Sequence, residues 1–193
     1  MSGVWASEEL TQCVETSTRS LEILKLPVDA PCIVFAEVSG SIQGEVKTPL
    51  SKRPILNNEE WKNFYYKINE ISKYMEDNGM PLAYHHHMGT IVQSQEDTER
   101  LIDNTSDTVR LLIDTGHMMF AGGDFVKIAK DYSSRLHHIH CKDSRKEVLE
   151  NSLKNDLSFI DAFLAGAFTV PGDGCINYEI FLKLLKGFKY NGW

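Results

Sequence analysis

The histidines of this chain gather at the ends of apolar segments, where side chains can do chemistry. Three of the seven are consecutive, His85-His86-His87, and follow a short apolar run. His117 ends the run that starts at Leu111, and the other three lie between positions 137 and 140. Histidine titrates near neutral pH and is the commonest metal ligand. The pattern therefore indicates proton transfer, metal binding or both.

The spacing of these residues suggests which side chains share a face. Side chains alternate along a strand, so His85 and His87 are expected on one side and His86 on the other, packed against a helix. Asp114 and His117 form an Asp-x-x-His pattern after an apolar run. This pattern favours a metal ligand at Asp114, although a capping role in the turn that follows is an alternative.

Other polar residues receive structural interpretations. His137 and His138 are expected at the surface or behind the site. Asp173, in the segment Pro171-Gly172-Asp173-Gly174, is expected to be a turn residue first, because glycines on both sides permit unusual backbone angles.

Strands and helices are predicted to alternate along the chain. Apolar periodicity and capping residues predict helices over 7–25, 58–78, 94–103, 124–132, 146–164 and 177–188. Short apolar runs predict strands over 33–38, 81–87, 109–114, 136–140 and 167–170. Such alternation predicts an α/β fold with a parallel sheet and crossover helices.

A partial (β/α)8 barrel explains this pattern better than an open doubly wound sheet. No GxGxxG loop follows an early strand, as an open nucleotide-binding sheet would require. In a barrel, functional residues lie at the carboxyl ends of successive strands, where these histidines fall. Eight βα units need roughly 250 residues. The 193 residues are therefore expected to form one incomplete barrel domain of about five parallel βα units, with residues 1–30 as an N-terminal helical segment.

Composition narrows the partners. The net charge of −7 and the pI near 5.5 argue against nucleic acid and against anionic membranes. The chain has no apolar run near the ~20 residues of a membrane span. The N-terminus lacks the features of a signal peptide, and the four cysteines form no CxxC pair. A cytoplasmic protein with free thiols is expected.

Six segments of the chain form a distinctive set. They are Glu37-Val38-Ser39-Gly40-Ser41-Ile42-Gln43-Gly44, His85-His86-His87-Met88-Gly89-Thr90, Asp114-Thr115-Gly116-His117, Phe120-Ala121-Gly122-Gly123-Asp124, His140-Cys141-Lys142-Asp143 and Phe168-Thr169-Val170-Pro171-Gly172-Asp173-Gly174. Together they resemble a known family, the inosose dehydratases of bacterial inositol catabolism. The family belongs to the sugar phosphate isomerase/epimerase superfamily with the xylose-isomerase-like barrel, and the resemblance covers about residues 31–193.

The resemblance implies a chain that is truncated at both ends. Family members begin with additional βα units before the Glu37 strand. They continue beyond Trp193 into a strand that bears a glutamate, a metal ligand in the wider superfamily.

The resemblance also implies roles for particular residues. Asp114 and His140 match metal ligands of the superfamily. His85 stands where the superfamily has the Glu of a Glu-x-His pattern, so His85 is expected to replace that ligand. An Asp-His-His set suits Mn²⁺, Co²⁺, Fe²⁺ or Zn²⁺ better than Mg²⁺ or Ca²⁺. Mn²⁺ or Co²⁺ is the favoured cofactor, and glutathione is a second candidate.

The implied reaction is the dehydration of 2-keto-myo-inositol, a cyclic polyol ketone. His87 and His117 are the candidates for base and acid, with the order left open. Lys142 is expected to stabilise the enolate or orient the substrate, and Glu37 to bind substrate hydroxyls. The alternatives are a sugar isomerase or epimerase of the same superfamily, and an inactive metal-binding fragment.

An open barrel should expose parts of its sheet. The expected edges are the strands at 33–38 and 167–170, and the uncovered inner face should leave Val34 or Leu112 near water. Such surfaces favour association, so a homo-oligomer or poor solubility is expected.

Overall fold

A four-stranded parallel sheet organises the described part of the chain. The computed structural model describes residues 31–193. Its strands are β1 (Ile33–Phe35), β2 (Leu82–His85), β3 (Val109–Asp114) and β4 (Leu136–His140), which are hydrogen-bonded in that order. Each strand lies beside the one that precedes it in the sequence, as in the wall of a barrel. The expected α/β class with a parallel sheet is confirmed.

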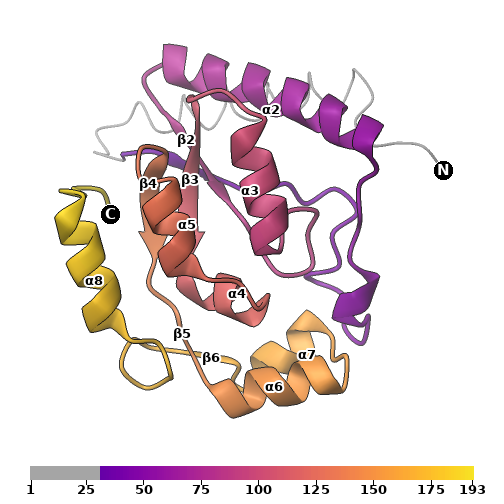
Figure 1. The fold of residues 1–193 in the computed structure, drawn as a ribbon. Helices are drawn as coiled ribbons and strands as arrows, with labels where there is room; N and C mark the ends of the chain where they lie inside the picture. The colour runs from indigo at the N-terminus through magenta and orange to yellow at the C-terminus, as the bar shows by residue number, and fades with distance from the viewer. Residues whose placement is uncertain (1–30) are drawn as a thin grey trace.

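Helices occupy the connections between strands (Figure 1). They are the 3-10 helix η1 (Leu50–Lys52), α2 (Asn58–Asp77), α3 (Gln95–Asp103), α4 (Thr115–Phe120), α5 (Phe125–Asp131), α6 (Lys146–Lys154), α7 (Phe159–Leu164) and α8 (Tyr178–Gly187). Figure 1 shows α4, α6 and α7 beyond the carboxyl ends of the sheet strands. The polar residues at those strand ends therefore lie between the sheet and this group of helices.

Helix α2 confirms the predicted helix over 58–78 and covers one face of the sheet. The Asn57 side chain accepts hydrogen bonds from the Glu59 and Glu60 N–H groups, and Glu60 completes a capping box. The apolar stripe of α2 packs with Leu82 and Tyr84 of β2 in one buried cluster. Burial of this stripe supplies most of the helix's stability, because helix propensity alone is weak.

A second buried cluster joins β3 and β4 to α5 and α8. Leu111 and Ile113 of β3 lie in it with Ile128 of α5 and Phe181 of α8. Alternate residues of β3, among them Asp114, thus point to the opposite face of the sheet. The helices anchor the strands whose ends carry the site.

The predicted helix over 146–164 is wrong in its middle, because the chain forms two helices there. Helix α6 ends at Lys154, and Ser158 begins α7 by accepting a hydrogen bond from the Asp161 N–H. Between them Asp156 has φ +45°, which a continuous helix excludes. The Asp156 carboxylate accepts hydrogen bonds from the Ser51 N–H and hydroxyl, so the 3-10 helix η1 contacts the chain at this break.

The predicted parallel strand over 167–170 is also wrong. Strand β6 (Phe168–Thr169) pairs antiparallel with β5 (Asp143–Ser144) in a separate two-stranded sheet. The described sheet therefore has four parallel strands, and its second edge is β4. On that edge the Ile139 N–H donates a hydrogen bond to the Trp193 carbonyl at 2.8 Å.

Exposure on the inner face of the sheet follows expectation at one position and not at the other. Val34, on the edge strand, is 43% exposed, as predicted. Leu112 is fully buried, contrary to the prediction. Leu112 lies on a central strand and is paired with His85 of β2 on one side and His138 of β4 on the other. Val34 lies on the edge strand and has a neighbouring strand on one side only.

Further expectations concern the rest of the chain. Cys32, Cys141 and Cys175 are free thiols, as predicted, and Cys13 and the predicted helix over 7–25 lie outside the described residues. Within residues 31–193, no helix is long and apolar enough to cross a membrane.

Candidate metal centre

Three predicted metal ligands meet at the carboxyl ends of adjacent strands. His85 ends β2, Asp114 ends β3 and His140 ends β4. Asp114 pairs with His140 in the sheet register. Asp114 Oδ2 lies 3.4 Å from His85 Nε2 and 3.4 Å from His140 Nδ1. One ligand atom from each residue lies within 4.8 Å of the others.

The arrangement of this cluster fits a divalent metal. His85 Nε2 is buried and makes no hydrogen bond, and the buried Asp114 Oδ2 faces His85, His140 and the Lys142 ammonium group. Two ligand atoms about 2.1 Å from a common metal stand about 3.0–3.5 Å apart at bond angles of 90–110°. The separations from Asp114 Oδ2 fall in this range. Since a buried polar atom without a hydrogen-bond partner costs free energy, a metal at this position would explain why His85 Nε2 is tolerated there.

The protonation states also suit metal binding. Burial lowers the pKa of His85 below its ordinary value, which favours the neutral ring. Burial alone would raise the pKa of Asp114, but the neighbouring His140 and His85 rings outweigh it, so the pKa of this carboxyl is lowered. A neutral imidazole and an ionised carboxylate are the forms that bind metals.

Asp114 performs the capping role as well as facing the cluster. Its Oδ1 accepts a hydrogen bond from the His117 N–H at 2.9 Å and so caps α4. Its own N–H donates to His86 Nε2 at 3.2 Å. The two interpretations of Asp114 are therefore compatible, because each uses a different carboxylate oxygen. Helix α4, which the apolar pattern did not predict, begins at this cap.

The three predicted catalytic residues stand next to this cluster. The His87 and His117 rings have centroids 3.8 Å apart. Lys142 Nζ lies 2.9 Å from Asp114 Oδ2 and 3.0 Å from His117 Nε2. Burial lowers the pKa of His87 to about 4 and that of His117 well below its ordinary value. Both rings are thus neutral near pH 7.

Two phenylalanine rings form an apolar wall beside these histidines. The Phe159 ring lies 5.0 Å from His87 and 5.6 Å from His117, and the Phe168 ring lies 5.0 Å from His117. The sequence analysis assigned neither residue to the site, because a Phe in a helix or short strand is indistinguishable from a core residue.

Glu37 lies apart from the metal cluster. It is 2% exposed, and its carboxylate accepts a hydrogen bond from the Ser39 N–H. Burial raises its pKa. Its charge acts on Tyr84, whose ring packs on the helix side of the sheet. Its role in substrate binding stays a prediction.

The remaining histidines behave as the strand pattern indicated. His86 is fully buried and, as the acceptor for the Asp114 N–H, holds β2 and β3 together where the ladder ends. His138 is half-buried beside the His140 ring, with centroids 5.3 Å apart, and His137 contacts the Pro31 carbonyl. Asp173 lies in a turn and pairs with Arg145.

Asp143 is a buried residue that the sequence analysis left without a role. Its carboxylate accepts hydrogen bonds from the N–H groups of Ser144, Gly172, Gly174 and Ile176. It thereby ties the Pro171–Gly174 turn to the chain segment that carries Lys142. Its position just after a buried strand was the available signal.

Asp143→Ala should destabilise the fold by about 2–5 kcal/mol, because buried N–H groups lose their acceptor. Urea unfolding at pH 7 measures this, with the exposed Asp173→Ala as a control that should change little. Burial raises the pKa of Asp143, but the N–H donors prevail and lower it. The stabilisation of the fold by ionised Asp143 is therefore fully present above the unfolded pKa of about 3.9. It is lost as the pH falls through the lower pKa of the folded state. Equal stability of the wild type and Asp143→Ala would contradict the assigned role.

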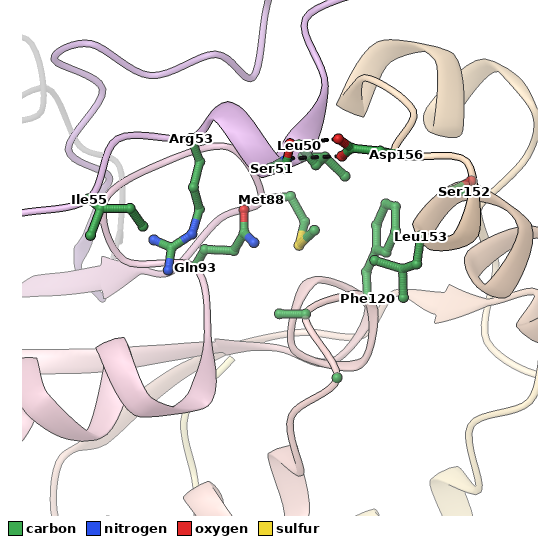
Figure 2. A pocket seen from close by; sticks show the side chains of 12 residues that line it. Leu50, Ser51, Arg53, Ile55, Met88, Gln93, Phe120, Ser152, Leu153 and Asp156 are labelled. Atoms are coloured by element: carbon green, nitrogen blue, oxygen red, sulfur yellow. Dashed lines mark hydrogen bonds between the residues drawn. The ribbon is translucent and has the colours of Figure 1, made fainter.

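A cavity of about 320 Å³ opens beside the centre (Figure 2). Figure 2 shows Met88, Phe120 and Leu153 around it, with the Ser51–Asp156 hydrogen bonds at one side. Its lining includes no ligand of the metal cluster. Met88 nevertheless directly follows His87, so the cavity is a neighbour of the site.

The sequence of the chain matches one family over most of its length. Residues 14–193 match the xylose isomerase-like TIM barrel family. The chain belongs to this family. Family membership confirms the expected fold class, because the four parallel strands are then part of a barrel wall.

Two curated relatives and one solved structure illustrate the likeness. Rhizopine catabolism protein MocC of Rhizobium meliloti is 43% identical over 161 residues, which are 83% of this chain and 50% of that protein. An inosose dehydratase of Clostridium perfringens is 42% identical over 166 residues, which are 85% of this chain and 56% of that protein. The chain thus spans about half the length of these relatives. The IOLI protein with a binding zinc atom has a TM-score of 0.58 at 19% identity, over 95% of this chain and 56% of that one, and supports the fold.

Proposed function

We propose that this chain takes part in the metal-dependent dehydration of 2-keto-myo-inositol to a trihydroxycyclohexane-dione. The observation that carries the proposal is the cluster of His85, Asp114 and His140, with His87, His117 and Lys142 beside it. Relatives at about this level of likeness are named inosose dehydratase, which supports the choice of a cyclic polyol ketone as substrate.

His85, Asp114 and His140 would hold the metal. When bound, a divalent metal polarises the ketone oxygen and stabilises the charge that develops on it. The mixed nitrogen and oxygen set accepts Mn²⁺, Co²⁺ or Zn²⁺, with Mn²⁺ or Co²⁺ the favoured ions. The zinc of the IOLI structure is consistent with a metal in this fold.

The histidine pair supplies the proton transfers. Dehydration breaks the C–H bond next to the ketone and the C–O bond on the following carbon. The electron pair of the C–H bond forms the new C=C bond, and the hydroxyl leaves as water after it gains a proton. His87 and His117, neutral and in contact, can take the first proton and return one to the leaving group.

Lys142 supplies positive charge in the same place. Its Nζ lies between Asp114 Oδ2 and His117 Nε2. From there it can stabilise an enolate oxygen or orient a substrate hydroxyl. The rings of Phe159 and Phe168 limit water near the histidines, which strengthens these electrostatic interactions.

A mass measurement tests the proposal. The chain, loaded with Mn²⁺ or Co²⁺, should convert 2-keto-myo-inositol to a product lighter by one water that absorbs in the ultraviolet. The same protein treated with a chelator is the control and should be inactive. A product of unchanged mass would indicate an isomerase or epimerase, and no product with metal bound would contradict a dehydratase.

A further inference from the structure

The hydroxyl of Thr115 makes hydrogen bonds with both the N–H and the carbonyl group of Lys142. Thr115 is completely buried. Its Oγ1 accepts a hydrogen bond from the Lys142 N–H at 3.0 Å and lies 2.9 Å from the Lys142 carbonyl, to which it donates. The Tyr178 hydroxyl lies 2.8 Å away and supplies a third partner. A hydroxyl has one proton and two lone pairs. Of the two carbonyl oxygens near the Thr115 hydroxyl, that of Lys142 at 2.9 Å is nearer than that of His140 at 3.2 Å.

The next residue presses against Lys142 directly. A Cβ placed on Gly116 would lie 3.0 Å from Lys142 Cγ, from the Lys142 carbonyl oxygen and from Phe168 Cδ1. These separations are tighter than ordinary van der Waals contact, so a side chain at this position would displace Lys142 or Phe168. Glycine therefore permits the close approach of Lys142 and Phe168 here, and no unusual backbone angle is involved.

The ammonium end of Lys142 contacts Asp114 Oδ2 at 2.9 Å and His117 Nε2 at 3.0 Å at the end of a flexible side chain. Its side chain is 32% exposed, and Nζ lies 5.0 Å over the Phe168 ring. A lysine side chain has four rotatable bonds and loses considerable entropy when it is fixed. Fixing its backbone and Cγ reduces the positions that the ammonium group can reach.

We propose that Thr115 and Gly116 are positioning residues for Lys142. By fixing the backbone of Lys142, they determine where its ammonium group lies relative to Asp114, His117 and the Phe168 ring. The importance of this position for turnover rests on the proposed function. In the segment Asp114-Thr115-Gly116-His117, the outer residues contact the Lys142 amine and the inner residues fix its backbone.

Nuclear magnetic resonance tests the positioning without any activity. In ¹³C-lysine-labelled protein, the ε-methylene signal of Lys142 should be shifted by the Phe168 ring current. Lys142→Met assigns the signal, and Phe168→Leu removes the shift. Thr115→Val should move the signal toward the value of an exposed lysine, whereas Thr115→Ser and Tyr178→Phe should keep it. Gly116→Ala, which leaves the hydroxyl intact, should move it as well.

Each outcome decides the proposal. An unchanged Lys142 signal in folded Thr115→Val and Gly116→Ala would overturn it. If Thr115→Val does not fold, Gly116→Ala alone decides. Thr115 Oγ1 also lies 3.2 Å from the His140 carbonyl, so metal affinity is measured in parallel. A lower affinity with an unchanged Lys142 signal would assign Thr115 to His140 and also overturn the proposal.

Turnover gives a second readout. Thr115→Val should lower kcat by about 10–100-fold with a smaller change in KM, because misplacement of a group by about 1 Å can cost about 100-fold. Thr115→Ser should recover most of the loss. If the wild type fails to dehydrate 2-keto-myo-inositol but the Lys142 signals behave as expected, the proposed function fails and the positioning role stands.

Discussion

Asp114→Ala is expected to weaken the affinity for Mn²⁺ or Zn²⁺ by at least about 100-fold, more than the loss typical of an outer-shell residue. The substitution removes the carboxylate of the cluster and leaves two imidazoles. Calorimetric titration of the metal-free chain measures the change. Asp114→Asn should lose a similar amount, because the amide keeps the size of the side chain but lacks its charge.

Asp124→Ala is a matched control for this experiment. Asp124 caps α5 by accepting hydrogen bonds from the Val126 and Lys127 N–H groups, just as Asp114 caps α4. Both alanine variants lose an N-cap, at a cost of about 0.5–2 kcal/mol in stability. Only Asp114→Ala should lose metal. An affinity within threefold of the wild type in folded Asp114→Ala would refute the ligand assignment.

His117→Gln is expected to lower kcat for dehydration by about 10²–10⁴-fold, the usual contribution of a general acid or base. Glutamine has no ring nitrogen that could receive a proton from the substrate, whereas the neutral His117 ring has one. Metal affinity should stay near the wild-type value, because His117 is outside the ligand cluster.

His137→Gln is the comparison for His117→Gln. His137 is a half-buried histidine of β4 that contacts the Pro31 carbonyl and not Lys142. Its substitution should leave kcat nearly unchanged. If His117→Gln kept a kcat within threefold of the wild type with metal bound, the proton-transfer role would pass to His87 alone.

The sheet and the metal cluster follow from local sequence features. The apolar runs that end at Asp114 and His140 predicted strands with the bounds of β3 and β4, and Asn177 and Asp124 cap helices as expected. Parallel strands bring their carboxyl ends to one edge, so residues at these ends meet without any further information. This is why polar residues at these strand ends were expected at one edge, whereas the choice of His85, Asp114 and His140 as metal ligands came from the family resemblance.

The loops that complete the site depend on contacts between distant residues. The break between α6 and α7 depends on the contact of Asp156 with Ser51, 105 residues away in sequence. Strand β6 pairs with β5, and the Asp143 carboxylate of β5 accepts hydrogen bonds from N–H groups of the Pro171–Gly174 turn. Thr115 likewise resembles any threonine in a capping position until Lys142 and Tyr178 are beside it. Such pairings have no periodicity, so a local pattern cannot predict them.

The two oxygens of Asp114 couple metal binding to the folding of a helix. Oδ1 holds the first turn of α4 while Oδ2 faces the other ligands. When that turn frays, the carboxylate is free to rotate, and the free energy of ordering α4 becomes part of the free energy of binding. A substitution on the far side of α4, remote from every ligand atom, can thus alter metal affinity. Conversely, metal would suppress the local opening of α4 by the same amount of free energy, as thermodynamic reciprocity demands.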